Sequence, residues 1–385
     1  MKLFEDKIRT DLNPANHIDN SFDFCDRNSQ PKIEKVRNIL NHWFSHYPED
    51  EQYELKCRFQ KEFDSALHEL FLHELFLNQG FDIVIHPKLP HTAKTPDFLL
   101  SKNGVEFYLE AKVSTGRSNE TKSYEQRLNS LYDSLNKIKS PNFFLGIKNI
   151  QLKTSKQPST KELIKTVEAE LLKYDVKTIE NRIVKSETLQ DLTDIHFENQ
   201  DVDISFYLIP KSQSIRGKKG IRPIGVYPSY THWGGSEDDI KTSLEKKANR
   251  YGTLDKPYLI AINSIGSIMT NEYDADDAIW GSLQVLYSTD PNNRDTKYTR
   301  ARNGFFLDNS GIRHTGVSGV LITRMNLGNI QNSEYWLYKH PWAKYEINFE
   351  LIELSYSHIV LNTIKKVGKK QVEDILRLPQ EWIDF

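Results

Sequence analysis

PDFLLSKNGVEFYLEAKV, residues 96–113, is the stretch of this 385-residue chain that decides its fold. Two runs rich in apolar and aromatic residues are separated by Asn103-Gly104, the strongest short-range signal for a tight β-hairpin. If Asn103 and Gly104 form the turn, Lys102 pairs with Val105. The same register places Asp97 opposite Glu110.

The two faces of the second strand differ in character, because side chains alternate along a strand. The core-facing set is apolar and consists of Val105, Phe107, Leu109, Ala111 and Val113. The other set is mostly polar and consists of Glu106, Tyr108, Glu110 and Lys112. In this register Phe98 meets Leu109 and Leu100 meets Phe107, so the apolar face closes against its partner strand.

The facing carboxylates of Asp97 and Glu110 need an explanation, because like charges opposite each other destabilise a sheet. A divalent cation between them removes the repulsion, and Mg²⁺ prefers such oxygen ligands. Lys112 projects to the same side, where an ammonium group can orient an attacking water or neutralise charge that develops on a phosphate. The alternative is an ordinary amphipathic hairpin whose Asp, Glu and Lys are solvated.

Pro96-Asp97, twelve further residues and Glu110-Ala111-Lys112 together resemble the signature of the PD-(D/E)XK, or restriction-endonuclease-like, nuclease superfamily. The resemblance covers roughly residues 60–150. It implies a helix carrying a Glu, a strand, the hairpin, and then a helix and a strand, for which we expect residues 123–138 and 142–147. It also implies that Asp97 and Glu110 hold Mg²⁺ (or Mn²⁺), that Lys112 assists the attacking water, and that a helical Glu supports the metal.

Two residues are candidates for the helical Glu, on a helix predicted from about Glu51 to Asn78. Glu69 stands eleven residues before Gly80, a spacing similar to that of the superfamily, and lies at the edge of the apolar stripe. Glu74 falls near the centre of that stripe, where a carboxylate needs a partner or a metal. We favour Glu69 as a catalytic and metal-supporting residue and retain Glu74 as the alternative.

We expect an α/β fold, with a restriction-endonuclease-like core in which a mixed central sheet is flanked by helices. The expected division is an N-terminal arm and helices over 1–59, the core over 60–175, a connector over 176–200 and a C-terminal α/β region over 201–385. The last region would supply nucleic-acid contacts or the interface of a homodimer.

The composition bounds the remaining choices. The net charge of −2 gives no overall basic signature, although residues 214–222 and 293–302 are locally basic, as phosphate-contacting loops or solvated turns. Two cysteines, Cys25 and Cys57, form no disulfide framework, and no apolar run is long enough to span a membrane. We therefore expect a cytoplasmic protein without membrane contact.

The sequence thus predicts a Mg²⁺-dependent endodeoxyribonuclease acting on DNA. The resemblance implies a role in restriction, phage defence or repair. Two alternatives stay open: an RNA- or structure-directed nuclease, and a catalytically silent nucleic-acid-binding or assembly protein with the same fold.

Overall fold

The computed structural model describes residues 1–116, 119–185, 192–218, 220–228, 235–266, 269–288, 292, 294–330, 332–361 and 363–378. The chain divides into two compact units. Unit 1 comprises residues 1–13, 20–116 and 234–385, and unit 2 comprises residues 14–19 and 117–233. In the described residues, no helix is both long and apolar enough to cross a membrane.

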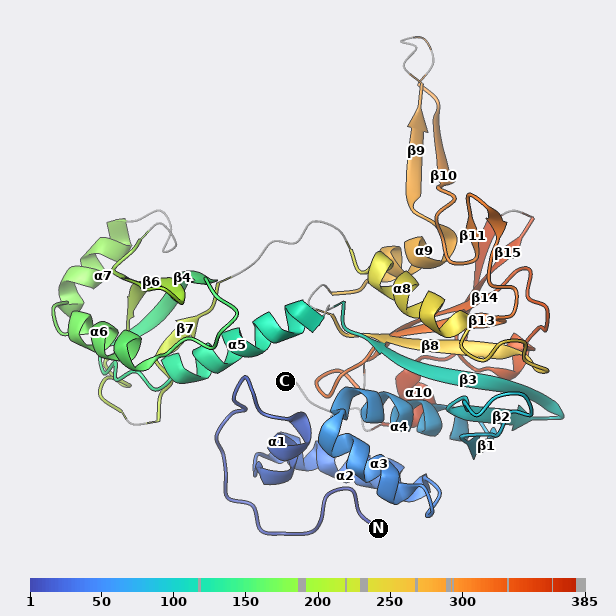
Figure 1. The fold of residues 1–385 in the computed structure, drawn as a ribbon, viewed down its shortest axis with the longest axis horizontal. Helices are drawn as coiled ribbons and strands as arrows, with labels where there is room; N and C mark the ends of the chain where they lie inside the picture. Colours follow the sequence, from blue (N-terminus) through green and yellow to red (C-terminus); the bar gives the residue numbers. More distant parts are fainter. Residues whose placement is uncertain are drawn as a thin grey trace. The chain divides into compact units, whose positions relative to one another are not determined.

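Unit 1 is built on an eight-stranded mixed sheet in the order β1-β2-β3-β8-β13-β14-β15-β16 (Figure 1). Neighbouring strands are antiparallel except for three parallel pairs, β3 with β8, β8 with β13, and β14 with β15. The strands are β1 (Asp82–Ile85), β2 (Phe98–Lys102), β3 (Val105–Ser114), β8 (Tyr258–Ser264), β13 (Gly319–Arg324), β14 (Glu334–Lys339), β15 (Tyr356–Val360) and β16 (Thr363–Val367).

Helices cover both faces of this sheet. The helices of unit 1 are α1 (Ser21–Arg27), α2 (Pro31–His46), α3 (Gln52–Lys61), α4 (Phe63–Leu77), α8 (Glu237–Ala248), α9 (Glu272–Trp280), a 3₁₀ turn at Phe349–Leu351 and α10 (Val372–Leu376). Phe107 and Leu109 of β3 belong to the core shared with α1–α4 and α10. Tyr108 of β3 belongs to the second core, shared with α8 and α9. Alternate side chains of one strand thus serve two cores.

The predicted hairpin is confirmed. Phe98 pairs with Leu109, and Lys102 pairs with Val105. Asn103 and Gly104 have φ values of 52° and 76°, the doubly positive pair that a two-residue type I′ turn requires. The predicted helix from about Glu51 to Asn78 is instead two helices, α3 and α4. The chain leaves helical geometry at Glu62, with φ −136° and ψ 57°, so the two halves can pack on each other as one straight helix could not.

Unit 2 has its own four-stranded sheet, in the order β5-β6-β4-β7, and its own apolar core. Its strands are β4 (Phe143–Leu152), β5 (Ile195–Glu198), β6 (Val202–Pro210) and β7 (Ile224–Val226), and its helices are α5 (Asn119–Leu135), α6 (Lys161–Leu171) and α7 (Val176–Lys185). The segment 14–19 is fastened here, because the backbone N–H groups of His17 and Ile18 donate to the Asp133 carboxylate at 2.9 and 3.1 Å.

The expected domain boundaries need correction. Unit 2 is inserted between β3 and α8, so a core over 60–175 joins parts of two compact units. The helix and strand expected to follow the hairpin in the core are α5 and β4, and β4 pairs with β6 and β7 instead of β3. The strand beside β3 is β8. Residues 176–200 were expected to be a connector but contain α7 and β5, whose apolar residues Ile179 and Ile195 are buried in the core of unit 2.

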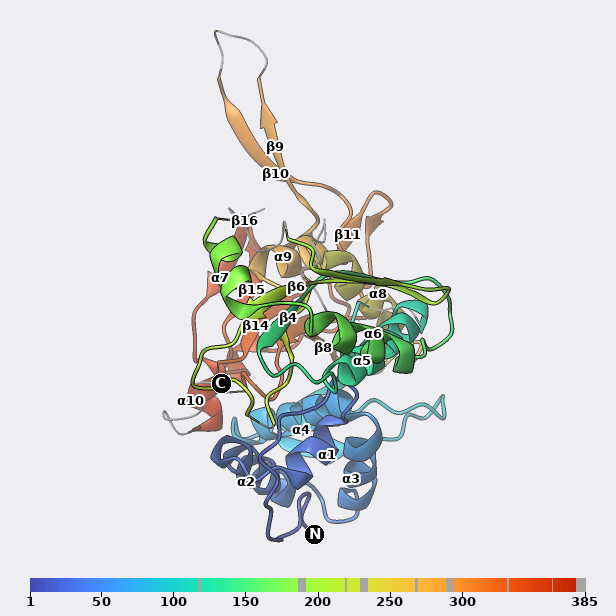
Figure 2. The same cartoon turned by 90° about the vertical axis from the view of Figure 1, so that its left-hand side faces the viewer.

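Smaller strands complete unit 1. The strands β9 (Leu283–Tyr287) and β10 (Thr296–Arg300) form a separate antiparallel pair, and Figure 2 shows this ribbon extending away from α9 and the sheet. A further short pair is β11 (Leu307–Asp308) and β12 (Gly311–Ile312). Arg300 anchors the base of the ribbon through Asp276 and Asp277 at 3.2 and 2.9 Å.

Candidate functional site

The hairpin brings Asp97 next to the start of the Glu110-Ala111-Lys112 segment. Asp97 directly precedes β2, whose first residue, Phe98, pairs with Leu109, the residue before Glu110. The backbone N–H of Ala111 donates to Asp97 Oδ2 at 2.6 Å. This hydrogen bond holds the Asp97 carboxyl beside the Glu110-Ala111 segment of β3.

The helix α4 decides between the two candidate glutamates. Glu69 is 4% exposed, accepts a hydrogen bond from the Tyr47 hydroxyl at 2.6 Å, and forms an ion pair with Arg58. Its negative charge acts on Asp97. Glu74 instead meets His46 at 2.9 Å. Of the two candidates, Glu69 is the one that the structure associates with Asp97.

The electrostatics of Asp97 are those of a crowded acidic site. Burial, followed by the negative charges of Glu110 and Glu69, raises the pKa of Asp97 from 3.8 to about 8. The Ala111 N–H and the Lys247 ammonium act in the opposite direction but are weaker. Carboxylates from α4 and β3 thus act on the carboxyl group at the entry to β2, as is common where a site binds a cation or a proton.

Glu110 has partners that the hairpin alone does not predict. It is 1% exposed, because α8 and the residues that follow it cover this face of β3. Lys247 forms an ion pair with Oε1, the Tyr251 hydroxyl donates to Oε2, and Arg250 Nε lies 3.6 Å from Oε1. Sequence reasoning missed these groups, which lie more than 130 residues from the hairpin. The only signal was a basic and aromatic run over residues 246–251.

The tyrosine partners of these carboxylates are also perturbed. Burial and the charge of Glu110 raise the pKa of Tyr251, and burial and the charge of Glu69 raise the pKa of Tyr47. Both phenols therefore stay protonated over the physiological range and act as hydrogen-bond donors to their carboxylates.

Lys112 follows Glu110 on the same side of β3, as the two-residue period requires, and is exposed. Its backbone pairs with Ile262 of β8. Lys112 therefore reaches solvent, whereas Glu110, two residues before it, is buried beneath the end of α8.

The expected metal ligands have the donor chemistry that Mg²⁺ prefers, since all three offer carboxylate oxygens. Glu69, Asp97 and Glu110 nevertheless do not form a preassembled triad. In the described part of the chain, the two groups of three whose donor atoms lie within 4.8 Å of one another are His42, His46 and Glu74, and His196, Glu198 and Asp203. We call Glu69, Asp97 and Glu110 the acidic cluster. A cation bound there would replace contacts that Lys247 makes with Glu110 and Arg58 makes with Glu69.

The two basic segments differ from the simple picture of phosphate-binding loops. In 214–222, Arg216 pairs with Glu180 at 2.7 Å, and Arg222 donates to the backbone carbonyl oxygen of Ala15 at 3.0 Å. In 293–302, Arg300 is held by two aspartates of α9. Lys219 and Asn293 lie outside the described residues. These arginines therefore make internal contacts within their own units.

Comparison with known proteins assigns no family. No family model matches the chain, and no curated protein or solved structure matches it significantly.

Proposed function

We propose that unit 1 is a metal-dependent nuclease that hydrolyses phosphodiester bonds, with DNA as its substrate. The observation that carries this proposal is the buried Asp97 carboxyl, which is held by the Ala111 N–H at 2.6 Å. Burial, followed by the charges of Glu110 and Glu69, raises its pKa to about 8. A buried carboxyl group whose pKa is strongly raised beside two other carboxylates favours a binding or catalytic role over a purely structural one.

The order of elements supports the proposal. A helix bearing Glu69 precedes β1, the hairpin β2–β3 carries Asp97 and Glu110, and α8 leads to β8, which lies parallel to β3. This is the order that the resemblance to restriction-endonuclease-like nucleases implies, with unit 2 inserted between β3 and α8. Restriction, phage defence and repair are the roles that such an activity would serve.

Asp97, Glu110 and Glu69 would hold the ion, and Mg²⁺ or Mn²⁺ would supply Lewis-acid charge at the phosphate. The chain's own cationic side chains would act on the attacking water and on the phosphate groups of the substrate. Lys112, exposed beside this cluster, would orient the attacking water or neutralise charge on the phosphate. Lys247 and Arg250 would offer further positive charge to the substrate backbone once Glu110 exchanges its partners.

A second candidate function rests on the partners of Glu110. Lys247 and Tyr251 engage one carboxylate oxygen each, an arrangement that stabilises the site without a metal. It favours a catalytically silent protein that binds nucleic acid or serves in assembly. The presence of Asp97, Glu110 and Lys112 together favours the enzyme.

The test is cleavage of supercoiled plasmid, linear duplex DNA, single-stranded DNA and RNA, with Mg²⁺, Mn²⁺ or EDTA. Asp97→Ala and Lys112→Ala should abolish metal-dependent cutting. Asp82→Ala on β1 and Lys365→Ala on β16 are matched controls, because both residues are exposed on strands of the same sheet, and they should cut like the wild type.

Each outcome distinguishes the candidates. Cutting of RNA alone would replace DNA as the substrate. Binding without cutting in the wild type would favour the silent protein. Cutting that survives both Asp97→Ala and Lys112→Ala would show that the acidic cluster is not the active site.

A further inference from the structure

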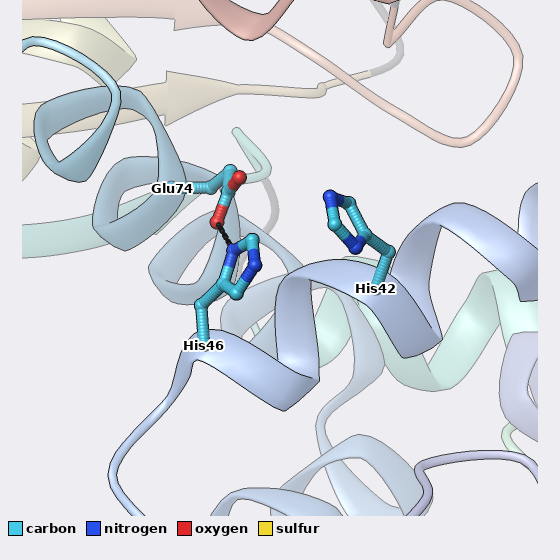
Figure 3. A group of neighbouring side chains, drawn as sticks. All are labelled: His42, His46 and Glu74. Atoms are coloured by element: carbon cyan, nitrogen blue, oxygen red, sulfur yellow. Dashed lines mark hydrogen bonds and ion pairs between the residues drawn. The ribbon is translucent and has the colours of Figure 1, made fainter.

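Glu74, the glutamate that does not join the acidic cluster, lies in a second group of potential ligands. Figure 3 shows its carboxylate on α4 directed toward His46 of α2, with His42 beside it. His46 Nδ1 lies 2.9 Å from Glu74 Oε2, and the two imidazole rings are 4.5 Å apart, edge to face. One donor atom from each residue lies within 4.8 Å of the others.

The placement of these residues suits a metal. His42 and His46 are separated by four residues on α2 and therefore project from one side of the helix. Both are exposed, so their rings are free to reorient. Glu74 is 3% exposed and is held by Asn78 Nδ2 at 2.8 Å. The site thus combines one fixed, buried oxygen donor with two adjustable nitrogen donors at the surface.

We propose that His42, His46 and Glu74 form a zinc site that joins α2 to α4. Two imidazoles and one carboxylate are a recognised set of Zn²⁺ ligands, with a fourth position left for water. Zn²⁺ bonds of about 2.0–2.1 Å at tetrahedral angles place donor atoms about 3.4 Å apart. Small rotations of the exposed histidines therefore complete the geometry. The proposal does not depend on the nuclease activity.

The donor types separate this site from the acidic cluster. Imidazole nitrogen favours zinc and other late transition metals, whereas carboxylate oxygen alone favours Mg²⁺ and Mn²⁺. Unit 1 would therefore bind zinc at His42, His46 and Glu74, and Mg²⁺ or Mn²⁺ at the acidic cluster. Glu74 and Glu69 lie on the same helix, and Tyr47, which follows His46 directly, donates to Glu69. Zinc bound by His42, His46 and Glu74 would thus hold α4, the helix that positions Glu69.

The rival group, His196, Glu198 and Asp203, is less suited to zinc. It offers a single imidazole, and none of its members is buried. His196 Nε2 lies 3.1 Å from Asp203 Oδ1, which is an ordinary contact between neighbouring strands. The experiment nevertheless has to distinguish zinc binding at this group from zinc binding at His42, His46 and Glu74.

The experiment is zinc titration of the untagged full chain after treatment with EDTA and dialysis. Isothermal titration calorimetry should give one tight Zn²⁺ site per chain, and Co²⁺ should produce the visible absorption of a tetrahedral nitrogen- and oxygen-ligated ion. His42→Ala and Glu74→Gln should each weaken Zn²⁺ binding by about 100-fold or more, since loss of a mere supporting contact costs 10–100-fold.

Three variants serve as controls and should bind Zn²⁺ as the wild type does. His358→Ala removes a histidine outside both groups, His196→Ala removes the imidazole of the rival group, and Asp97→Ala disables the acidic cluster. Circular dichroism of His42→Ala checks its fold, and this exposed position should tolerate the change.

Several results would overturn the proposal. These are no saturable zinc binding in the wild type, undiminished binding in both His42→Ala and Glu74→Gln, or binding lost only in His196→Ala or Asp97→Ala. None of these results depends on nuclease activity, so failure of the zinc site and failure of the proposed enzyme are distinguishable.

Discussion

Replacing Lys247 by Met tests whether a lysine supplies the positive charge that the acidic cluster needs. Lys247 pairs with Glu110, and their side chains are 13% and 2% exposed. Removing one partner of a buried ion pair costs about 3–5 kcal/mol, because it leaves an uncompensated buried charge. Since Lys247 retains some exposure and Arg250 Nε stays 3.6 Å from Glu110 Oε1, we expect a loss near the lower end, about 3 kcal/mol.

Urea unfolding followed by tryptophan fluorescence measures this loss in unit 1, because every tryptophan except Trp233 belongs to that unit. The double variant Lys247→Met with Glu110→Gln should recover most of the stability, since no buried charge is then left unpaired. Added Mg²⁺ should stabilise Lys247→Met more than the wild type, because the ammonium no longer competes for Glu110.

Two results would refute the reasoning. A loss below about 1 kcal/mol for Lys247→Met would mean that the pair behaves as a solvated surface pair. An equal response of Lys247→Met and wild type to Mg²⁺ would mean that lysine and metal do not compete at Glu110.

Three further predictions concern stability in unit 1. Asp97→Asn should stabilise the protein in EDTA at pH 8 by a few kcal/mol, because the pKa of Asp97 is raised from 3.8 to about 8 in the folded protein. Between these two values the free energy of unfolding of the wild type falls by about 1.4 kcal/mol per pH unit, because Asp97 ionises only on unfolding. Below pH 3.8 this loss is absent, so thermal melts of the two proteins should converge at pH 4. Burial lowers the pKa of His68 from 6.5 to about 3, so the wild type should lose stability as pH falls below 6.5, and His68→Leu should lose less in urea titrations at pH 7 and 4.5. Gly281→Ala should destabilise by at least about 1–3 kcal/mol, because Gly281 has φ +92° and an added Cβ would lie 2.0 Å from the Ala301 carbonyl oxygen; Gly368→Ala, which meets no atom within 4 Å, should melt like the wild type.

Local chemistry made much of the site predictable. Asn103-Gly104 sets the turn, the turn sets the register, and the register brings Asp97 to the Glu110-Ala111 segment. Each step acts over a few residues, so the sequence contains all the necessary information. The choice of Glu69 over Glu74 was weaker, because both lie on one helix and both are buried. Only the packing of α2 and α3 against α4 directs one toward Tyr47 and Arg58 and the other toward His46.

The sequence by itself determined the hairpin, the alternation of its two faces, and the positions of Asp97 and Glu110. Only the tertiary structure decided which strand lies beside β3 and which groups cover Glu110. The next helix and strand along the chain, α5 and β4, are buried in the separate core of unit 2. The strand β8 and the residues Lys247 and Tyr251 arrive from beyond that insertion. Strand pairing and ion pairing at such separations depend on where whole elements pack, and no local pattern of residues specifies that packing.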